Sequence, residues 1–546
     1  MIAAVTLALL VGGGDAAYDL VLAGGSVVDG TGAPARTSDV GIVGDRIAAV
    51  GDLAAAQARR RVDARGLVVA PGFIDMLGQS EYNVLVDPRA ASKVTQGITT
   101  EITGEGTAIA PLSARMIEDA RAVYDHYGVA PDWTTLAGYW KAFVRARPAI
   151  NLGTFVGAGG VRKLVMGSDN RPPTTAELEE MKRQVAQAME EGAFGLSTSL
   201  IYVPGRFART SEIVELAKVA RRYGGTYITH QRDEGDVIFK SLDEVFRIAR
   251  EAQVPAEIYH LKTAGRVNWG KMPAVLRRIE QARAEGLDVT ANVYPWTASA
   301  NALEAALPAW AREGGRAKLV ERLKDPKLRE RVTRDLLKEN RRWDETSARA
   351  ILITWVIDPA LKRYEGKTLV EIGREQEKLP HDAMIDLLIA GQGNVGRITF
   401  SMSEDDVRAA VRHPLVSMCT DSGAVAEDGV FSDERSHPRG WASTARILGR
   451  YVRDEKLLPL EEAVRKMTSL PATRMRLGDR GVVRPGAFAD LVAFDLARVR
   501  ERSTYADPSH YSEGFPYVAV NGELVVDQGR LTGARPGRPL YGPGKR

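Results

Sequence analysis

One stretch of the chain, residues 224–265, restricts the possible folds more than any other. It contains two short apolar runs, Thr226–His230 and Ala256–Leu261, whose β-branched and aromatic residues favour buried strands. Between them lies a segment whose apolar residues recur at helical spacing. The stretch is therefore expected to form a strand–helix–strand unit with parallel strands. Such a unit would deliver His230 and His260 to the same edge of a sheet.

The same alternation continues through the middle of the chain. Eight apolar runs of β-favouring composition are separated by helical patterns, which predicts an α/β fold of the (β/α)₈ (TIM) barrel type. In a barrel of this type the carboxyl ends of the strands form the working face. The predicted strands are Gly72–Leu77, Gly97–Thr103, Ile150–Val156, Ala193–Ser199, Thr226–His230, Ala256–Leu261, Asp288–Tyr294 and Val416–Thr420.

The two ends of the chain differ from this middle, which is expected to span residues 71–480. Residues 18–70 and 481–546 both contain short apolar runs between Gly and Asp turns, a pattern that indicates antiparallel strands. A sheet of two or three strands is only marginally stable alone. We therefore expect the two ends to pair with each other in one small β domain.

A long connection separates the seventh and eighth predicted strands. Its residues 311–345 are rich in Arg, Lys and Glu at helical spacing, which predicts a helical insertion at about 303–350. The insertion can be interpreted as a solvated surface excursion or as a lid over the mouth of the barrel.

Composition excludes several classes of protein. A length of 546 residues exceeds one ordinary core and suits a large barrel with a smaller domain, and 44% apolar with 26% charged residues is typical of a soluble globular protein. The net charge of +4, without a basic run interleaved with aromatics, gives no case for nucleic-acid binding. Cys419 is the only cysteine, which excludes an intrachain disulfide and a Cys-rich zinc site. No apolar segment reaches the length of a membrane-spanning helix.

The first residues have some features of a secretory leader. Residues 2–11 form an apolar run of about the length of a signal-peptide core, and small residues follow before Tyr18. No Lys or Arg precedes the run. The pattern favours a leader at residues 1–17 and export to the periplasm or beyond. The alternative is a leader without fixed structure on a cytoplasmic enzyme.

Polar residues at the ends of the predicted strands form a candidate metal site. Glu105 follows the second strand, and His230 and His260 lie at the ends of the fifth and sixth strands. Two imidazoles and one carboxylate suit Zn²⁺ with a fourth position open for water. Asp421 follows the eighth strand and is placed to take a proton from that water. Each residue alone has a plainer interpretation, as a hydrogen-bonded strand end or a helix cap, so the prediction depends on their joint placement.

Four further residues are candidates for substrate contact. Lys262 lies two residues beyond His260 and can bind an anionic group, although most lysines are simply solvated. Tyr294 ends the seventh strand, where a tyrosine more often packs than binds. Arg439, in the sequence His-Pro-Arg, can equally belong to a plain turn. Gln79 lies just beyond the first strand.

Several longer motifs, each different, are distributed along nearly the whole chain, from Tyr18 to Leu540. They are Ala70–Asp75, Thr95–Thr100, Gly195–Leu200, Thr229–Gly235, Tyr294–Ser299, His437–Arg439, Leu448–Val452, Glu462–Thr468 and Gly533–Arg538. In these motifs the chain resembles the N-acyl-D-amino-acid deacylases (D-aminoacylases) of the amidohydrolase superfamily. The resemblance implies a zinc-bearing (β/α)₈ barrel, a small β-sandwich built from both chain ends, and an insertion near the active site. It also implies hydrolysis of N-acyl-D-amino acids to a carboxylate and a free D-amino acid.

The resemblance also implies roles for individual residues. His230 and His260 match zinc ligands of the family, and Asp421 matches its catalytic aspartate. The positions associated with the anionic end of the substrate are those of Lys262, Tyr294 and Arg439.

The chain departs from the family pattern in three places. The usual His-x-His after the first strand is replaced by Leu77 and Gln79, and the usual histidine after the third strand is Ala158. Glu105 stands where the family has a cysteine. These changes leave almost no ligands for the family's second, weaker metal position, so one metal ion per chain is expected. The carboxylate ligand suits zinc and also admits Mn²⁺ or Co²⁺.

Three functions fit these features. The first is a zinc-dependent hydrolase of N-acyl amino acids, D-configured by resemblance. The second is a hydrolase of small D-containing or iso-dipeptides or cyclic amides, which the altered first-strand turn would suit. The third is a non-catalytic binding protein on the same scaffold, motivated by the loss of His-x-His. The retention of His230, His260, Lys262 and Asp421 together argues against it.

Overall fold

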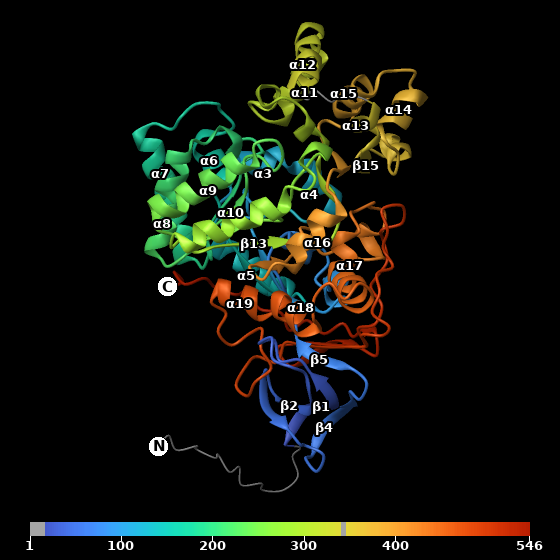
Figure 1. Ribbon diagram of the computed structural model, residues 1–546. Helices are drawn as coiled ribbons and strands as arrows, with labels where there is room; N and C mark the ends of the chain where they lie inside the picture. The colour runs from blue at the N-terminus through green and yellow to red at the C-terminus, as the bar shows by residue number, and fades with distance from the viewer. Residues whose placement is uncertain (1–16, 340–344) are drawn as a thin grey trace.

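The computed structural model describes residues 17–339 and 345–546. The leader expected at residues 1–17 lies outside this range except for its last residue. Figure 1 shows three parts in line: a small β domain at one end, the barrel in the middle and the insertion at the opposite end. Across the described residues, no helix combines the length and the apolar character needed to cross a membrane.

Eight parallel strands form the barrel. They are β6 (Phe73–Asp75), β7 (Ile98–Thr103), β8 (Asn151–Thr154) with its continuation β9 (Val156–Gly157), β10 (Gly195–Ser199), β11 (Thr226–His230), β12 (Ala256–Ile258), β13 (Val289–Val293) and β17 (Val416–Met418). Parallel ladders join β6 to β8 and β9 to β17. The Phe194 amide donates to the Thr154 carbonyl at 2.9 Å, and the Met76 amide donates to the Met418 carbonyl at 3.4 Å, which closes the ring. The predicted (β/α)₈ barrel is confirmed.

Helices cover the outside of the barrel. Those from Leu136 onward are α5 (Leu136–Ala146), α6 (Ala158–Met166), α7 (Thr175–Glu190), α8 (Thr210–Arg222), α9 (Ile238–Ala252), α10 (Met272–Ala284), α16 (Glu404–Arg412), α17 (Arg439–Arg446) with the π-helical η7 (Ile447–Asp454), α18 (Leu460–Met467) and α19 (Ser469–Met475). Earlier ones are α1 (Asn83–Val86), α2 (Ala91–Val94), α3 (Ala114–Asp119) and α4 (Arg121–Tyr127).

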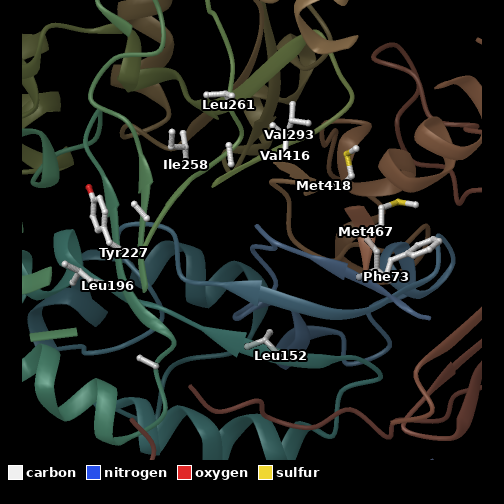
Figure 2. Packing of buried hydrophobic residues seen from close by; sticks show 14 of the residues in the cluster. Phe73, Leu152, Leu196, Tyr227, Ile258, Leu261, Val293, Val416, Met418 and Met467 are labelled. Carbon is white, nitrogen blue, oxygen red and sulfur yellow. The ribbon is translucent and has the colours of Figure 1, made fainter. Parts of the chain in front are cut away.

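The main core lies between the strands and these helices. Leu196, Tyr227 and Ile258 from three successive strands are buried there, as Figure 2 shows. On α9, Leu242 and Val245 face the same core, as the helical spacing of the sequence predicts. Burying an aliphatic side chain of this size contributes about 1.5–3 kcal/mol. The packing therefore fixes the strand ends that carry the polar residues.

The β domain combines both ends of the chain. Its strands are β1 (Tyr18–Val27), β2 (Arg36–Val43), β3 (Arg46–Gly51), β4 (Ala58–Asp63), β5 (Val68–Pro71), β18 (Leu491–Phe494), β19 (Tyr517–Val520), β20 (Glu523–Asp527) and β21 (Arg530–Leu531). The antiparallel pair of β5 and β18 joins the two ends, with Val69 opposite Ala493. Ile47 and Leu491 share the core of this domain. These nine strands belong to one sheet. The small β domain expected from both chain ends is confirmed.

The insertion has a core of its own. It contains β14 (Ala298–Ala302), α11 (Arg316–Lys324), α12 (Pro326–Glu339), α13 (Glu345–Arg349), β15 (Ile351–Val356), α14 (Leu369–Glu375), α15 (Pro380–Ala390) and β16 (Val395–Phe400). The three strands form an antiparallel sheet, and Leu319, Val332 and Ile353 are among its buried core residues. The helical insertion expected at about 303–350 lies inside this segment, which continues to Phe400. Its charged residues cover a packed subdomain.

A buried ion cluster ties the first, second and eighth strands together. The Lys93 ammonium of α2 lies 2.6 Å from Glu101 Oε1 of β7 and 3.1 Å from Asp75 Oδ2 of β6. It also donates to Thr420 Oγ1 at 2.7 Å, just beyond β17. The Lys93, Asp75 and Glu101 side chains are all fully buried. A buried cation between two buried carboxylates is costly to remove, because each carboxylate then lacks its partner.

Replacing Lys93 with Met keeps the length of the side chain but removes its charge. Asp75 and Glu101 would be left as two unpaired buried carboxylates, so we expect the free energy of unfolding to fall by about 3–5 kcal/mol. Urea denaturation followed by tryptophan fluorescence measures this change. Lys240→Met, at an exposed position of α9, is the control and should stay within about 0.5 kcal/mol of the wild type. An unchanged denaturation midpoint for Lys93→Met would contradict the role of the cluster.

Candidate functional site

Three residues predicted as metal ligands come together at the mouth of the barrel. Glu105 follows β7, His230 ends β11, and His260 lies two residues beyond β12. Glu105 Oε1 is 2.8 Å from His230 Nδ1 and 3.4 Å from His260 Nε2. One potential ligand atom from each residue lies within 4.8 Å of the others. Within residues 17–339 and 345–546, this is the one group of three or more His, Cys, Asp or Glu side chains placed to share an ion.

Unusual backbone conformations hold this group in place. Glu105 lies between Gly104 and Gly106, whose φ angles are +97° and +65°. A Cβ atom at Gly106 would lie 2.4 Å from Ser199 Cβ, so only glycine fits there. His260 itself has a φ of +34°, and its amide donates to Asn292 Oδ1 at 2.7 Å. Non-glycine residues adopt such angles where the surrounding structure requires them, often at functional sites.

A fourth residue, Glu234, supports both histidines from behind. Its carboxylate lies 3.1 Å from His260 Nδ1 and 3.5 Å from His230 Nε2, the ring nitrogens that face away from Glu105. Histidines that bind metals usually pair their second nitrogen with a carboxylate or carbonyl, and Glu234 is placed to do so for His260, whose Nδ1 atom also lies 2.7 Å from Lys262 Nζ. His230 Nε2 has Glu234 nearby but makes no hydrogen bond with a described residue. The donor set and its support therefore fit a divalent metal ion. Sequence reasoning missed Glu234, although its spacing of four residues from His230 was a usable signal.

Carboxylates dominate the electrostatics around His260. Burial and the nearby Lys262 ammonium lower the pKa of His260. The carboxylates of Glu234, Asp421 and Glu105 raise it by more, to about 9. A divalent cation competes with protons for this imidazole, as metal binding to histidine generally does.

Asp421 lies directly beside the three-residue group. It follows β17 with a φ of +52°, and its amide donates to the Leu77 carbonyl at 2.8 Å. Its Oδ2 atom is 2.6 Å from Arg439 Nη1, and its Oδ1 atom accepts a hydrogen bond of 3.0 Å from Gln79 Nε2. Burial raises the pKa of Asp421, while Arg439 opposes this effect. The carboxylate is therefore held in a fixed orientation at the site.

Gln79 connects the two parts of the site. The same Nε2 atom that donates to Asp421 also donates to Glu105 Oε2 at 3.0 Å. Its predicted contact with substrate stays a prediction, whereas its contacts with two site carboxylates are plain in the structure. Sequence reasoning did not foresee this bridge, because residues 79, 105 and 421 follow three different strands.

The three residues expected near the anionic end of a substrate lie together on one side. The Tyr294 ring is 4.7 Å from the Arg439 guanidinium and 5.6 Å from the Lys262 ammonium. Its buried hydroxyl makes no hydrogen bond with any described residue, so it is free to donate to a bound molecule. The two cations are engaged: Lys262 Nζ lies 2.8 Å from Glu234 Oε1, and Arg439 pairs with Asp421.

His437 fixes the position of Arg439. The Arg439 amide donates to His437 Nδ1 at 2.9 Å, and His437 Nε2 lies 3.0 Å from the Ala298 carbonyl. Nε2 must then carry the proton, and burial keeps the pKa of His437 well below its usual range. This neutral histidine explains the His-Pro-Arg motif as a device that holds Arg439 at the site.

Known proteins share this architecture. The family described as "Amidohydrolase family" matches residues 60–526. The chain is 36% identical over 524 residues to a D-aminoacylase of Alcaligenes xylosoxydans xylosoxydans, covering 96% of this chain and 97% of that protein. Two solved structures cover 96% of the chain. One is a D-aminoacylase described for its binuclear metal centre, with one-metal activation and second-metal attenuation. It is covered completely, with a TM-score of 0.80 and 35% sequence identity. The other is an N-acyl-D-glutamate deacylase from Bordetella bronchiseptica complexed with zinc and a phosphonate inhibitor. It is 99% covered, with a TM-score of 0.81 and 33% sequence identity.

Proposed function

The chain belongs to the amidohydrolase family, among the D-aminoacylases, and on that basis we propose that it hydrolyses the amide bond of N-acyl-D-amino acids. The observation that carries the proposal is the meeting of Glu105, His230 and His260 beside the buried Asp421. Three metal ligands beside a carboxylate that can carry a proton form the minimum set for metal-assisted hydrolysis.

Glu105, His230 and His260 would hold a zinc ion, the metal found with the related N-acyl-D-glutamate deacylase. When bound, zinc polarises an acyl carbonyl and lowers the pKa of water. Glu234 lies beside the opposite nitrogen of each imidazole, and its negative charge favours the ring orientations in which the other nitrogens face the ion. A carboxylate in the place of a thiolate also suits Mn²⁺ or Co²⁺.

Asp421 acts as the proton carrier in this proposal. Its carboxylate accepts a proton from the attacking water and passes it to the departing amine, so the same group serves as base and then as acid. The contacts with Arg439 and Gln79 hold both carboxylate oxygens in place between the two steps. The unpartnered Tyr294 hydroxyl donates to the oxygen that gains negative charge as the carbonyl is attacked.

Arg439 and Lys262 would bind the carboxylate of the amino acid. Arginine can bind a carboxylate through two parallel hydrogen bonds, which favours Arg439 as the main contact. Both cations already have carboxylate partners, so a substrate carboxylate shares or replaces those partners when it binds. In the free enzyme these partners keep each buried cation next to an anion.

The proposal is tested with a panel of N-acyl amino acids in both configurations, assayed by release of the free amino acid. We expect hydrolysis of D-configured members, loss of activity after treatment with a chelator, and recovery when zinc is returned. The altered first-strand turn, with Leu77 and Gln79, gives reason to include D-containing and iso-dipeptides and cyclic amides. A metal-loaded protein that hydrolyses none of these compounds would contradict the proposal and favour a binding role.

A further inference from the structure

The end of the first strand contributes no metal ligand to this site. Leu77 is fully buried and apolar, and Gln79 offers only a neutral carboxamide. The Gln79 Nε2 atom lies 3.0 Å from Glu105 Oε2 and 3.0 Å from Asp421 Oδ1. Because carboxylates only accept hydrogen bonds, the nitrogen must face them, and each of its two hydrogens has one acceptor.

A second metal ion beside the first would need further carboxylate oxygens, and Gln79 already contacts one of Glu105 and one of Asp421. A second ion beside the first would share Glu105, whose Oε1 atom faces the two histidines and whose Oε2 atom faces Gln79. It would also need Asp421, the second carboxylate that Gln79 contacts. The amide nitrogen lies between these two oxygens, at hydrogen-bonding distance from both.

Three of the carboxylates around this position already have organic cations as partners. Asp75 and Glu101 both pair with the buried Lys93 ammonium, and the second oxygen of Asp421 pairs with Arg439. The negative charge of these three groups is thus already balanced by groups of the chain itself. A further ion bound by any of them would have to displace an ammonium, a guanidinium or the amide.

We propose that the Gln79 carboxamide takes the place of a second metal ion between Glu105 and Asp421 and limits this enzyme to one metal ion per chain. The amide orients the two carboxylates that such an ion would otherwise bridge. Attenuation by a second metal ion, described for a related D-aminoacylase, should therefore not occur here. The inference depends on the proposed function only in taking Glu105, His230 and His260 as the first metal site.

The test is the number of zinc ions per chain, measured by inductively coupled plasma mass spectrometry after equilibration with excess zinc and removal of free metal. The wild type should retain about one zinc per chain, and Leu77→His/Gln79→His, which adds two imidazoles beside Asp421, should retain about two. Gln376→Ala, in the insertion, where the amide contacts Tyr364, is the control and should match the wild type.

Each outcome decides the matter. Two zinc ions on the wild type, or one on a double variant whose circular dichroism shows it to be folded, would overturn the inference. If the double variant does not fold, Gln79→Glu replaces it, since the added carboxylate keeps the length of the side chain, with the same two outcomes. No zinc on the wild type would contradict the first site and so the proposed function as well, which separates the two failures.

Discussion

Replacing Asp421 with Asn is expected to lower kcat by about 10³- to 10⁴-fold, because an amide cannot accept the proton that the proposed mechanism assigns to this carboxylate. The variant should still bind zinc, since Asp421 is not among the three predicted ligands. Steady-state kinetics on the best substrate of the panel, together with zinc content, measures both effects.

The structure also predicts a stability cost for this variant. Both oxygens of Asp421 face donors, from Gln79 and Arg439, and Asn can accept from only one of them. The lost acceptor should cost about 1–3 kcal/mol without unfolding the barrel. Asp243→Asn, whose side chain is 60% exposed on α9, is the control and should leave kcat unchanged. A folded Asp421→Asn enzyme with kcat within tenfold of the wild type would exclude Asp421 as the proton carrier.

Removing any one ligand of the predicted metal site should have the second large effect. We expect His230→Ala, His260→Ala and Glu105→Ala each to reduce zinc content from about one per chain to near zero, with loss of hydrolysis, because two remaining ligands do not hold zinc firmly. Zinc content after dialysis, with circular dichroism to confirm folding, measures this. The control is His413→Ala, since His413 pairs with Glu280 in another contact.

A smaller effect is expected one step away from the metal. Glu234→Gln leaves all three ligands in place but weakens the support of both imidazoles, so zinc affinity should fall by about 10- to 100-fold.

A Glu105→Ala enzyme that keeps full zinc content and activity would show that the ligand set is wrong. A Glu234→Gln enzyme with unchanged zinc affinity would remove Glu234 alone from the account.

The barrel was predictable because its signal is local and repeated. Eight apolar runs separated by helical patterns imply parallel strands, and parallel strands bring their carboxyl ends together. For this reason Glu105, His230, His260 and Asp421 could be grouped from the sequence although they lie far apart in it. His260 was expected within the strand Ala256–Leu261, but β12 ends at Ile258 and the residue lies in a turn with positive φ.

The contacts around the metal ligands could not be predicted in the same way. Whether Gln79 faces substrate, Glu105 or Asp421 depends on how three loops turn after their strands, and no periodic pattern encodes that. The pairing of Arg439 with Asp421 is a further case, because the sequence indicates a cation at the site but not its partner. The insertion illustrates a third limit. Its charged residues lie on the surface of a subdomain with its own apolar core. That core could not be predicted, because the residues that form it come together only when the chain folds.

The central claim is that one divalent metal ion is bound by Glu105, His230 and His260. Anomalous diffraction at the zinc edge, from crystals of the full chain grown with zinc, tests it most directly. We expect one anomalous peak per chain at the barrel mouth, about 2.0–2.2 Å from one oxygen of Glu105 and one nitrogen of each histidine. A barrel mouth without such a peak, or a zinc ion there bound by other residues, would contradict it.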